Sequence, residues 1–471
     1  MSWLEMLQEK YFKKGSFSHA SPQLIRLFPY TTSSTTPKAL DELNSFFAIC
    51  GEALRDLAMV DNDVKCTSSS ILANIKDKIE TQRFSDLQHI LKTTLFDEND
   101  QIHCFHPTIF YHLTSRHNVK NITTFAQFSR DIFMGSHTKL APSPDFSVEK
   151  EPVNIFHSMI LKNLPPLNSR NAKRSNKFYK AQDSLRECFI QDCFFLKQDL
   201  RLYAAQLPEL LKFYFFIYQI RLVENLNSFF KDSAPQPFYF SVDWESLSKG
   251  RQSFQEGWKR IEKKLFTMFS HAHCLEMINY LPFEGLETPF SYREIKCWGQ
   301  NVSTQQKQEV LVHINELIRF YKESIENLDL DMHKFDSVRP YINANGDFEE
   351  KIKTFYRMIH FQFEHSNRKA AAGRYSKWLS QFATDNYLKR RGPLGHTLSL
   401  TRKQLLFLTR LCVGANPDGK LRLTDLWKEF SKRGVVFDFE TQKQILILFN
   451  KLNLIEKKSD SGDAQYVRAI F

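Results

Sequence analysis

The C-terminal stretch, Leu398 to Phe471, is the part of the sequence that most constrains the fold. Apolar residues three or four positions apart predict a helix from Leu398 to Cys412. A turn and a short strand-like run, Lys420 to Leu423, come next. Thr424 then stands where a helix N-cap is wanted, because its hydroxyl can accept an otherwise unpaired backbone N–H. We expect this second helix to end at Lys432-Arg433-Gly434.

Three further elements complete the C-terminal pattern. A third helix is predicted from about Phe439 to Leu452. Two strand-like runs, Leu454–Lys458 and Gln465–Phe471, follow it and are separated by a polar turn, Ser459 to Asp463. Helix, short strand, helix, helix and hairpin is the order of a winged helix–turn–helix. We therefore predict that fold for the end of the chain.

The remainder of the chain is expected to be a mainly α-helical, multi-domain body. Gly is scarce, at 15 of 471 residues, while Phe is abundant at 43, and helix-period patterns outnumber alternating ones. A polar segment with several prolines, 135–152, is the best candidate for a linker or an exposed loop. The predicted parts are a helical region at 1–134, this linker, an aromatic-rich helical body at 153–390 and a winged helix domain at 391–471.

The sequence predicts a soluble, cytoplasmic protein. The longest apolar run, Phe213–Ile220, is far shorter than the ~18 residues that a membrane span needs. The N-terminus has an early acidic residue and no cleavage-site pattern, so we expect no signal peptide. The eight cysteines include no C-x-x-C pair and fit no disulfide framework, which favours reduced, buried thiols.

The charge distribution favours a polyanionic partner. The net charge is +11, and the segment from Asn386 to Phe471 holds 16 Lys and Arg against 8 Asp and Glu. Basic and amide side chains of this segment could contact phosphates and base edges of double-stranded DNA. The candidate DNA-binding residues are Lys389, Arg390, Arg391, Arg402, Lys403, Gln442, Lys443, Asn450, Lys451, Lys457, Lys458 and Arg468.

A second interpretation of the same domain stays open. Many winged helices dock proteins, and the third predicted helix carries an apolar run, Ile445 to Phe449, that is wider than one buried face requires. Contact with DNA, contact with protein, or both are compatible with this pattern. If DNA is bound, we expect contacts to the backbone that tolerate many sequences.

Motifs for independent catalysis are absent from the sequence. There is no G-x-x-x-x-G-K-[ST] loop for nucleotide phosphates, no G-x-G-x-x-G, no G-x-S-x-G elbow and no H-E-x-x-H. Self-contained nucleotide hydrolysis is therefore not expected. We predict a chain without catalytic residues, cofactor or metal of its own.

Three groups of residues nevertheless have the types that metal sites use. Their spacing fits no known metal motif, and residues two apart on a helix point to different faces. A loop is also a poor frame for carboxylates that must hold Mg²⁺. The groups are His103, His106, His112 and His117; His271, His273 and Cys274; and Asp145, Glu149 and Lys150.

Several motifs resemble a known family. The tail Leu452–Val467, the run Lys389-Arg-Arg-Gly-Pro-Leu-Gly395, and the segment Phe238–Trp258 with Asp243-Trp-Glu resemble the DptG family of DNA phosphorothioation-dependent restriction proteins. The resemblance covers most of the chain, and its sharpest motifs lie near the C-terminus. It implies a non-ATPase subunit of a bacterial anti-phage complex that acts, with ATPase partners, on DNA lacking the phosphorothioate modification. It supplies no catalytic residues.

Two other classes of function remain as alternatives. A winged-helix transcriptional regulator would form a symmetric dimer on a two-half-site operator. A metal-dependent nuclease would use His103, His106, Asp145 or Glu149 and would nick DNA without a partner. We favour a DNA-contacting or scaffolding subunit whose chemistry is supplied by its partners.

Overall fold

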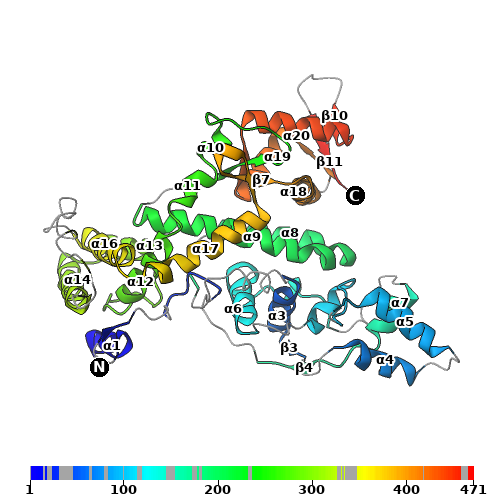
Figure 1. The fold of residues 1–471 in the computed structure, drawn as a ribbon, viewed down its shortest axis with the longest axis horizontal. Coiled ribbons are helices and arrows are strands. Elements are labelled where there is room, and N and C mark those ends of the chain that lie inside the picture. The colour runs from blue at the N-terminus through cyan, green and yellow to red at the C-terminus, as the bar shows by residue number, and fades with distance from the viewer. Residues whose placement is uncertain are drawn as a thin grey trace.

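The structure is a computed structural model, and it confirms a mainly helical chain with small mixed sheets in its C-terminal part (Figure 1). It describes residues 2–13, 16–18, 24–30, 46–62, 66–78, 83–98, 100–113, 119–144, 154–171, 178–179, 183–231, 236–325, 330, 334, 347–416, 418–457 and 465–470. Among these residues, none of the helices combines the length and apolar character that crossing a bilayer requires.

The N-terminal region consists of short helices and two small antiparallel strand pairs. Apolar periodicity predicts a helix near Phe84–Leu95, and α5 has these bounds. The elements are α1 (Trp3–Tyr11), β1 (Phe12–Lys13), β2 (Ser16–Phe17), α3 (Phe46–Ala58), β3 (Val60–Asp61), α4 (Ser68–Lys76), α5 (Phe84–Leu95), η1 (Pro107–His112), α6 (Val119–Ser129), η2 (Arg130–Met134), η3 (Thr138–Leu140), α7 (Ile155–Leu161) and β4 (Asn168–Ser169).

Two helices, α8 (Asp183–Lys197) and α9 (Leu200–Ser228), run through the middle of the molecule (Figure 1). Helical periodicity predicts one long helix here, but the structure has two, because the helix is interrupted before Asp199. The Asp199 carboxylate accepts the N–H groups of Arg201 and Leu202 and so begins a new helix. Because α9 is apolar on nearly all sides, it is buried along most of its length and forms the centre of the core.

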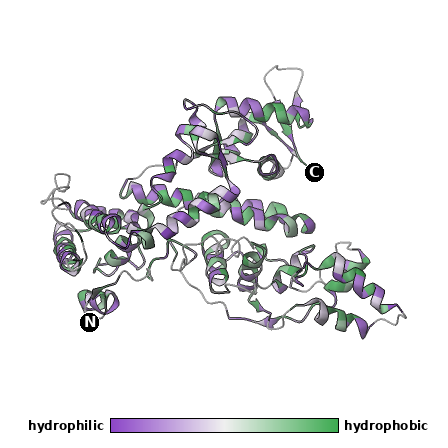
Figure 2. Cartoon of the chain, in the orientation of Figure 1, coloured by the Kyte–Doolittle hydropathy of each residue, from purple (hydrophilic) through white to green (hydrophobic). Residues whose placement is uncertain are grey.

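Among the described residues of the middle region, seven helices follow α9. Helical periodicity predicts one run over 253–281, but the run is interrupted at Gly257, whose ψ of −131° is not helical. Only glycine fits there, because a Cβ would lie 2.5 Å from the Ser253 carbonyl oxygen. On the outer helices α14 and α16, hydrophilic and hydrophobic residues alternate (Figure 2). The helices are α10 (Gln252–Gln255), α11 (Trp258–Glu262), α12 (Thr267–Ile278), α13 (Tyr292–Asn301), α14 (Thr304–Ile325), α16 (Phe348–His365) and α17 (Lys369–Asn386).

The C-terminal part contains two sheets. An antiparallel sheet has the strand order β10-β11-β8. A four-stranded sheet has the order β6-β7-β5-β9, in which the central strand β5 (Phe238–Val242) pairs in parallel with both β7 and β9. The other elements are β6 (Leu388–Arg390), η6 (Gly392–Leu394), β7 (His396–Leu400), α18 (Arg402–Gly414), β8 (Lys420–Arg422), α19 (Leu423–Lys432), β9 (Val435–Phe437), α20 (Phe439–Lys451), β10 (Ile455–Lys457) and β11 (Gln465–Arg468).

Three local predictions in this part are wrong. Leu398 to Leu400 lie in β7, and the helix starts after Thr401, whose side chain accepts the Gln404 N–H. Thr424 does not cap α19, because the helix already begins at Leu423 and its N-cap, Arg422, makes no side-chain cap. Lys389 belongs to strand β6 and does not end the preceding helix. The third helix, the hairpin strands and the short strand at residue 238 are confirmed.

Candidate nucleic-acid interface

Three parallel strands end at one edge of the four-stranded sheet. Val242 of β5 lies opposite Leu400 of β7, and Phe240 of β5 lies opposite Phe437 of β9. The segments that leave this edge are therefore Thr401 with α18, the loop after β5, and Asp438 with α20. In open sheets with parallel strands, ligands bind at the carboxyl ends of the strands. We call this place the carboxyl edge, and it comprises Trp244, Arg402, Lys403 and the ammonium group of Lys389.

The start of α18 concentrates positive charge at the carboxyl edge. Arg402 and Lys403 occupy the first turn and are exposed, and the fully described first turn contains no acidic residue. The N-terminal end of a helix already carries a partial positive charge from its aligned peptide dipoles. Two cations here are therefore mildly unfavourable for the helix, but they suit a bound anion.

The loop after β5 is fixed by cations from the β6–β7 hairpin and from α18. Lys389 donates to the Asp243 carbonyl oxygen. Arg391 donates to the Val242 and Glu245 carbonyl oxygens and to the Ser241 hydroxyl. The Arg402 guanidinium lies 5.9 Å from the ring centroid of Trp244.

Arg391 and Arg390 consequently have different environments. The several hydrogen bonds of Arg391 to β5 and its loop make it a structural residue, and burial lowers the pKa of its guanidinium. Arg390 is exposed on the hairpin. Of these two predicted DNA contacts, Arg390 is exposed and Arg391 is only partly so.

The start of α20 is anchored to the same loop region. Asp438 caps α20 by accepting the Thr441 N–H, and it also accepts hydrogen bonds from the Ser253 hydroxyl at 2.7 Å and from Arg251 Nε at 2.9 Å. Glu245 accepts from the Thr441 hydroxyl at 2.8 Å. Burial would raise the pKa of Asp438, but these hydrogen bonds, led by those of Arg251, lower it well below its usual range.

The polar residues predicted for the third helix are engaged mainly with α20 itself. Gln442 donates to the Phe437 carbonyl oxygen, and Asn450 donates to Leu446 one turn earlier. Lys443 forms an ion pair with Glu440 at 2.9 Å and lies over the ring of Phe439. The structure thus leaves few side chains of α20 ready to read base edges.

The exposed side of α20 is apolar at its centre. Phe439 is 69% exposed and Ile447, eight residues later on the same face, is 48% exposed. Lys443 lies between them in sequence, and Leu452 just after the helix is also exposed. Such a face is unusual for a helix that enters a DNA groove and suits contact with protein.

The twelve predicted contacts therefore do not form one patch. Lys389, Arg402 and Lys403 meet at the carboxyl edge, next to the loop that anchors the start of α20. Arg390 lies opposite His396, at the other end of β7. Lys451 is exposed at the far end of α20, about 20 Å along the helix. Lys457 lies in β10, Arg468 of β11 pairs with Glu456 at 3.2 Å, and Lys458 lies outside the described residues.

Two residues of this region were missed by the sequence-based site prediction. Trp244 lies beside Arg402, and Arg251 joins Glu245 and Asp438. A signal was present, because an apolar strand-like run at 238–242 ends directly in Asp243, Trp244 and Glu245. Its meaning depends on strands β7 and β9, which are more than 150 residues away along the chain.

The candidate metal groups have ordinary structural surroundings where they are described. His106 is buried and its Nδ1 accepts the Thr108 N–H, while the buried His271 lies 3.1 Å from the Tyr292 hydroxyl through its own Nδ1. Within the described ranges no three His, Cys, Asp or Glu side chains are placed to hold a metal ion. All eight cysteines are free thiols. The remaining candidates, His117, Asp145, Glu149 and Lys150, lie outside the described residues.

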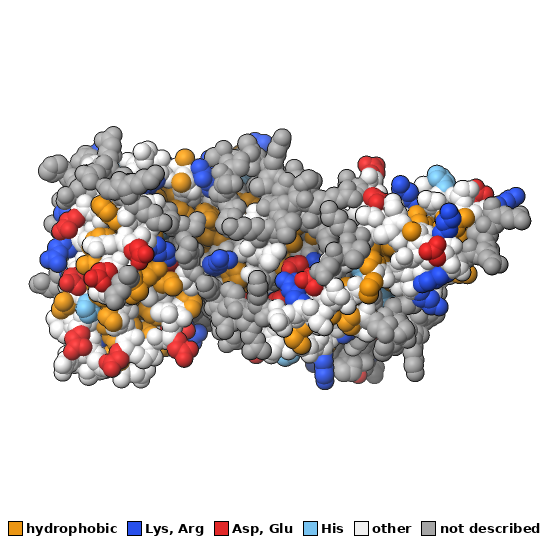
Figure 3. Space-filling model, turned by 90° about the horizontal axis from the view of Figure 1, so that it is seen from below, with side chains coloured by type: hydrophobic (Ala, Val, Ile, Leu, Met, Phe, Trp, Pro, Cys, Tyr) orange, Lys and Arg blue, Asp and Glu red, His pale blue; other side chains and the backbone are white. Residues whose placement is uncertain are grey.

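The lower face of the molecule offers no alternative basic surface among its described residues. Acidic and basic side chains are interspersed there, together with apolar ones (Figure 3). A nucleic-acid backbone requires a surface on which positive charge predominates. The carboxyl edge is therefore the better candidate.

Comparison with known proteins does not assign the chain to a family, because no protein family matches its sequence and no curated protein is significantly similar to it.

Proposed function

We propose that this protein is a non-catalytic, DNA-contacting subunit of a bacterial restriction-type complex in the cytoplasm. The observation that carries the proposal is the carboxyl edge, where the start of α18 meets the loop that anchors the start of α20, among the exposed cations Lys389, Arg402 and Lys403. Helix N-termini and such cations attract phosphate groups.

We further propose that the C-terminal part is a winged helix–turn–helix. The order α18, β8, α19, α20, β10 and β11, with the antiparallel strand order β10-β11-β8, supports this assignment. One strand is additional to this order: β9, between α19 and α20, pairs with β5 of the preceding body. The proposed winged helix would therefore be held rigidly on the body.

The proposed mode of DNA binding is contact with the sugar–phosphate backbone. The cations of the carboxyl edge are exposed, whereas Gln442 and Asn450 donate to backbone carbonyls of their own region. Contacts to phosphate position a protein on DNA without reading its sequence. We therefore expect binding that depends steeply on salt and weakly on sequence.

The resemblance to DptG supplies the remainder of the proposal. It implies ATPase partners and a target that lacks phosphorothioate modification, and the sequence has no phosphate-binding loop of its own. The two alternatives, a transcriptional regulator and a metal-dependent nuclease, predict different properties. The first would protect a two-half-site operator, and the second would nick DNA alone in the presence of metal.

A second candidate function is favoured by the apolar outer face of α20. Phe439 and Ile447 together present an exposed stripe that a helix of a protein partner could cover. Under this proposal the double variant Phe439→Ser, Ile447→Ser loses binding to the partner subunit and keeps its DNA affinity. If this variant instead lost DNA binding, α20 would be the DNA-contacting helix.

The first test is duplex DNA binding by the full chain over a series of salt concentrations. We expect log K to fall linearly with log salt, by about 0.9 for each phosphate contacted. If the hairpin also touches the backbone, the double variant Lys457→Glu, Lys458→Glu weakens binding at every sequence and reduces this slope. If the wild-type chain does not bind duplex DNA at low salt, the proposal is wrong.

A further inference from the structure

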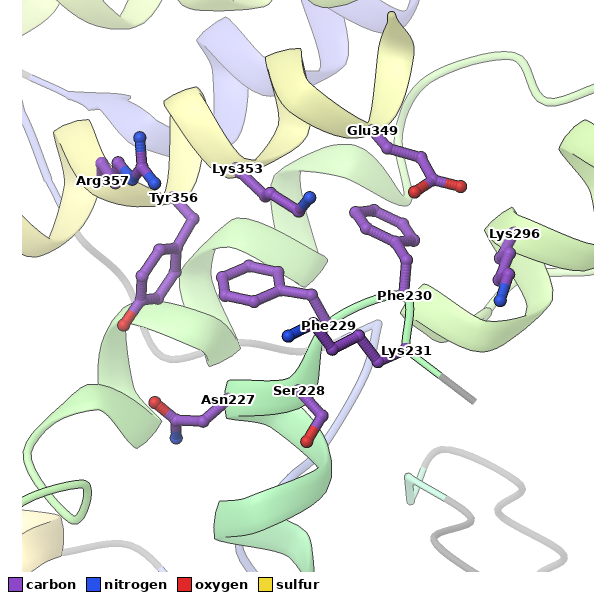
Figure 4. Close-up of a pocket in the computed structure, with 10 residues that line it drawn as sticks. All are labelled: Asn227, Ser228, Phe229, Phe230, Lys231, Lys296, Glu349, Lys353, Tyr356 and Arg357. Atoms are coloured by element: carbon purple, nitrogen blue, oxygen red, sulfur yellow. The ribbon is translucent and has the colours of Figure 1, made fainter. Parts of the chain in front are cut away.

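A pocket of about 390 Å³ lies where the end of α9 meets α13 and α16 (Figure 4). Its size is within the range of small-molecule sites in proteins. It is distinct from the carboxyl edge and does not include any residue of β5, α18 or α20. Its lining residues are Asn227, Ser228, Phe229, Phe230, Lys231, Lys296, Glu349, Lys353, Tyr356 and Arg357.

Positive charge predominates in the pocket lining. The lining contains four cations, Lys231, Lys296, Lys353 and Arg357, and one carboxylate, Glu349. Lys353 also forms an ion pair of 2.7 Å with Glu350, which is not part of the lining. Burial raises the pKa of Glu349, and nearby Asp347 adds to this effect, so its negative charge is not favoured by its surroundings. The lining therefore suits an anion better than a cation.

Aromatic rings form the floor of the pocket. Phe229 packs against Tyr356 with ring centroids 5.0 Å apart, and the ammonium group of Lys353 lies 5.9 Å from the centroid of Phe230 (Figure 4). Behind this floor the buried His271 stacks on Tyr356 at 4.1 Å. Because Phe229 and Tyr356 are nearly perpendicular, at 81°, a planar ligand ring could stack on the face of one of these rings, with cations nearby.

The backbone at Phe229 is in an unusual conformation. Phe229 ends α9 with φ 50° and ψ −114°, a region that glycine adopts readily and bulky residues rarely do. This conformation reverses the chain and directs both Phe229 and Phe230 into the pocket region (Figure 4). Strain of this kind persists where the surroundings enforce it, and it clusters at ligand sites.

We propose that this pocket binds a small phosphorylated molecule with a planar ring, of which a nucleoside monophosphate is the simplest representative. The phosphate would contact the lysine and arginine side chains, and the ring would stack on Phe229, which is partly exposed, whereas Phe230 is buried. The Asn227 amide, which already donates to the Val223 carbonyl, has its oxygen as a possible hydrogen-bond acceptor at the wall. This site does not depend on the DNA-binding proposal.

The test is isothermal titration calorimetry of the full chain with AMP, adenosine and inorganic phosphate. AMP is expected to bind with one site per chain, and adenosine and phosphate are each expected to bind at least about tenfold more weakly, because each keeps only half of the contacts. No heat of binding with AMP at millimolar concentration would overturn the proposal.

Variants locate the binding site. Lys353→Gln is expected to weaken AMP binding by about tenfold or more, since it removes a charge-assisted hydrogen bond. Arg357→Gln, at an exposed position of α16, tests the same point if Lys353→Gln does not fold. Lys377→Gln on α17, an exposed lysine outside the pocket, is the matched control and should leave affinity unchanged. AMP binding that is unaffected by both pocket variants would place the ligand elsewhere and overturn the proposal.

Discussion

Arg433 and Asp192 form an ion pair in the interior of the protein. Arg433, directly after α19, is 1% exposed and Asp192 of α8 is 0% exposed. Arg433 Nε donates to Asp192 Oδ2 over 2.9 Å, a second nitrogen donates to Oδ1, and the Tyr214 hydroxyl donates to Oδ2 at 2.6 Å. This pair joins the C-terminal part to the central helices.

The first prediction concerns this pair. Asp192→Asn keeps the shape of the side chain and leaves the buried guanidinium with less compensating charge, so unfolding should require about 3 kcal/mol less free energy. Urea denaturation of the full chain measures this difference. The control is Asp425→Asn, which removes the carboxylate from the exposed Asp425–Lys428 ion pair on α19 and should change stability little. Equal stability of Asp192→Asn and the wild-type chain would contradict the prediction.

The second prediction separates the two roles of Asp438. Asp438→Asn keeps an N-cap acceptor for α20 but loses the charge that pairs with Arg251, and it should lower stability by about 2 kcal/mol. Asp438→Ala should cost about 1 kcal/mol more, because the cap is lost as well. Denaturation curves of both variants give the comparison. If the two variants were equally stable, the cap would contribute nothing.

The lowered pKa of Asp438 also predicts the direction in which stability changes with pH. Because it is lower in the folded state than in the unfolded chain, the unfolded chain takes up the proton first as the pH falls. The stabilisation is therefore complete above pH ~4 and is lost in more acidic solution. Asp438→Asn should destabilise the protein less at about pH 3 than at about pH 7.

The third prediction concerns backbone strain at Phe229. Within a helix, glycine usually makes a protein about 1 kcal/mol less stable than alanine does. At Phe229 the order should reverse, because φ is positive there and glycine adopts such a conformation readily. Both variants remove the ring, and only glycine also relieves the backbone. Phe229→Gly should therefore be more stable than Phe229→Ala by about 1 kcal/mol or more. Thermal denaturation that ranks alanine above glycine would show that the conformation is not strained.

The fourth prediction follows from buried histidines. Burial lowers the pKa of His106 and of His112 to about 4 in the folded protein. In the unfolded chain a histidine takes up its proton near pH 6.5, so acidification favours unfolding from about 6.5 down to about 4. Each residue should contribute a loss of about 1.4 kcal/mol per pH unit in this window.

The variant His106→Asn tests this pH dependence. Asparagine can still accept the Thr108 N–H that Nδ1 of His106 accepts, and it does not titrate. The stability of His106→Asn should therefore fall less steeply than that of the wild-type chain between about pH 6.5 and 4. Parallel curves for the two proteins would contradict the assignment of a neutral, buried His106.

Local patterns predicted much of the secondary structure. The helix Phe84–Leu95, the third C-terminal helix and the hairpin strands follow from periodicity and turn residues. Thr424 was assigned wrongly because a good capping residue within a first turn looks the same in sequence as one at the N-cap. The domain division at residue 390 stays a prediction, and the sheet β6-β7-β5-β9 pairs strands from both sides of it.

The candidate site could be predicted only in part. Arg390 and Arg391 are neighbours of the same type, and only tertiary contacts reveal that Arg391 stabilises the loop after β5. The carboxyl edge itself arises from parallel pairing of β5 with β7 and β9, which is non-local and leaves no short-range pattern. The basic surplus was visible in the sequence, but its grouping was not.

The most direct test of the account compares two double variants in duplex DNA binding across a salt series. Arg402→Ala with Lys403→Ala removes two cations from the carboxyl edge, while Lys428→Ala with Lys432→Ala removes two exposed lysines from α19. We predict that the first variant binds more weakly and that its salt slope is smaller by about 2, with the second close to wild type. Equal affinities and slopes for the two variants would contradict the assignment of the carboxyl edge as the DNA-contacting surface.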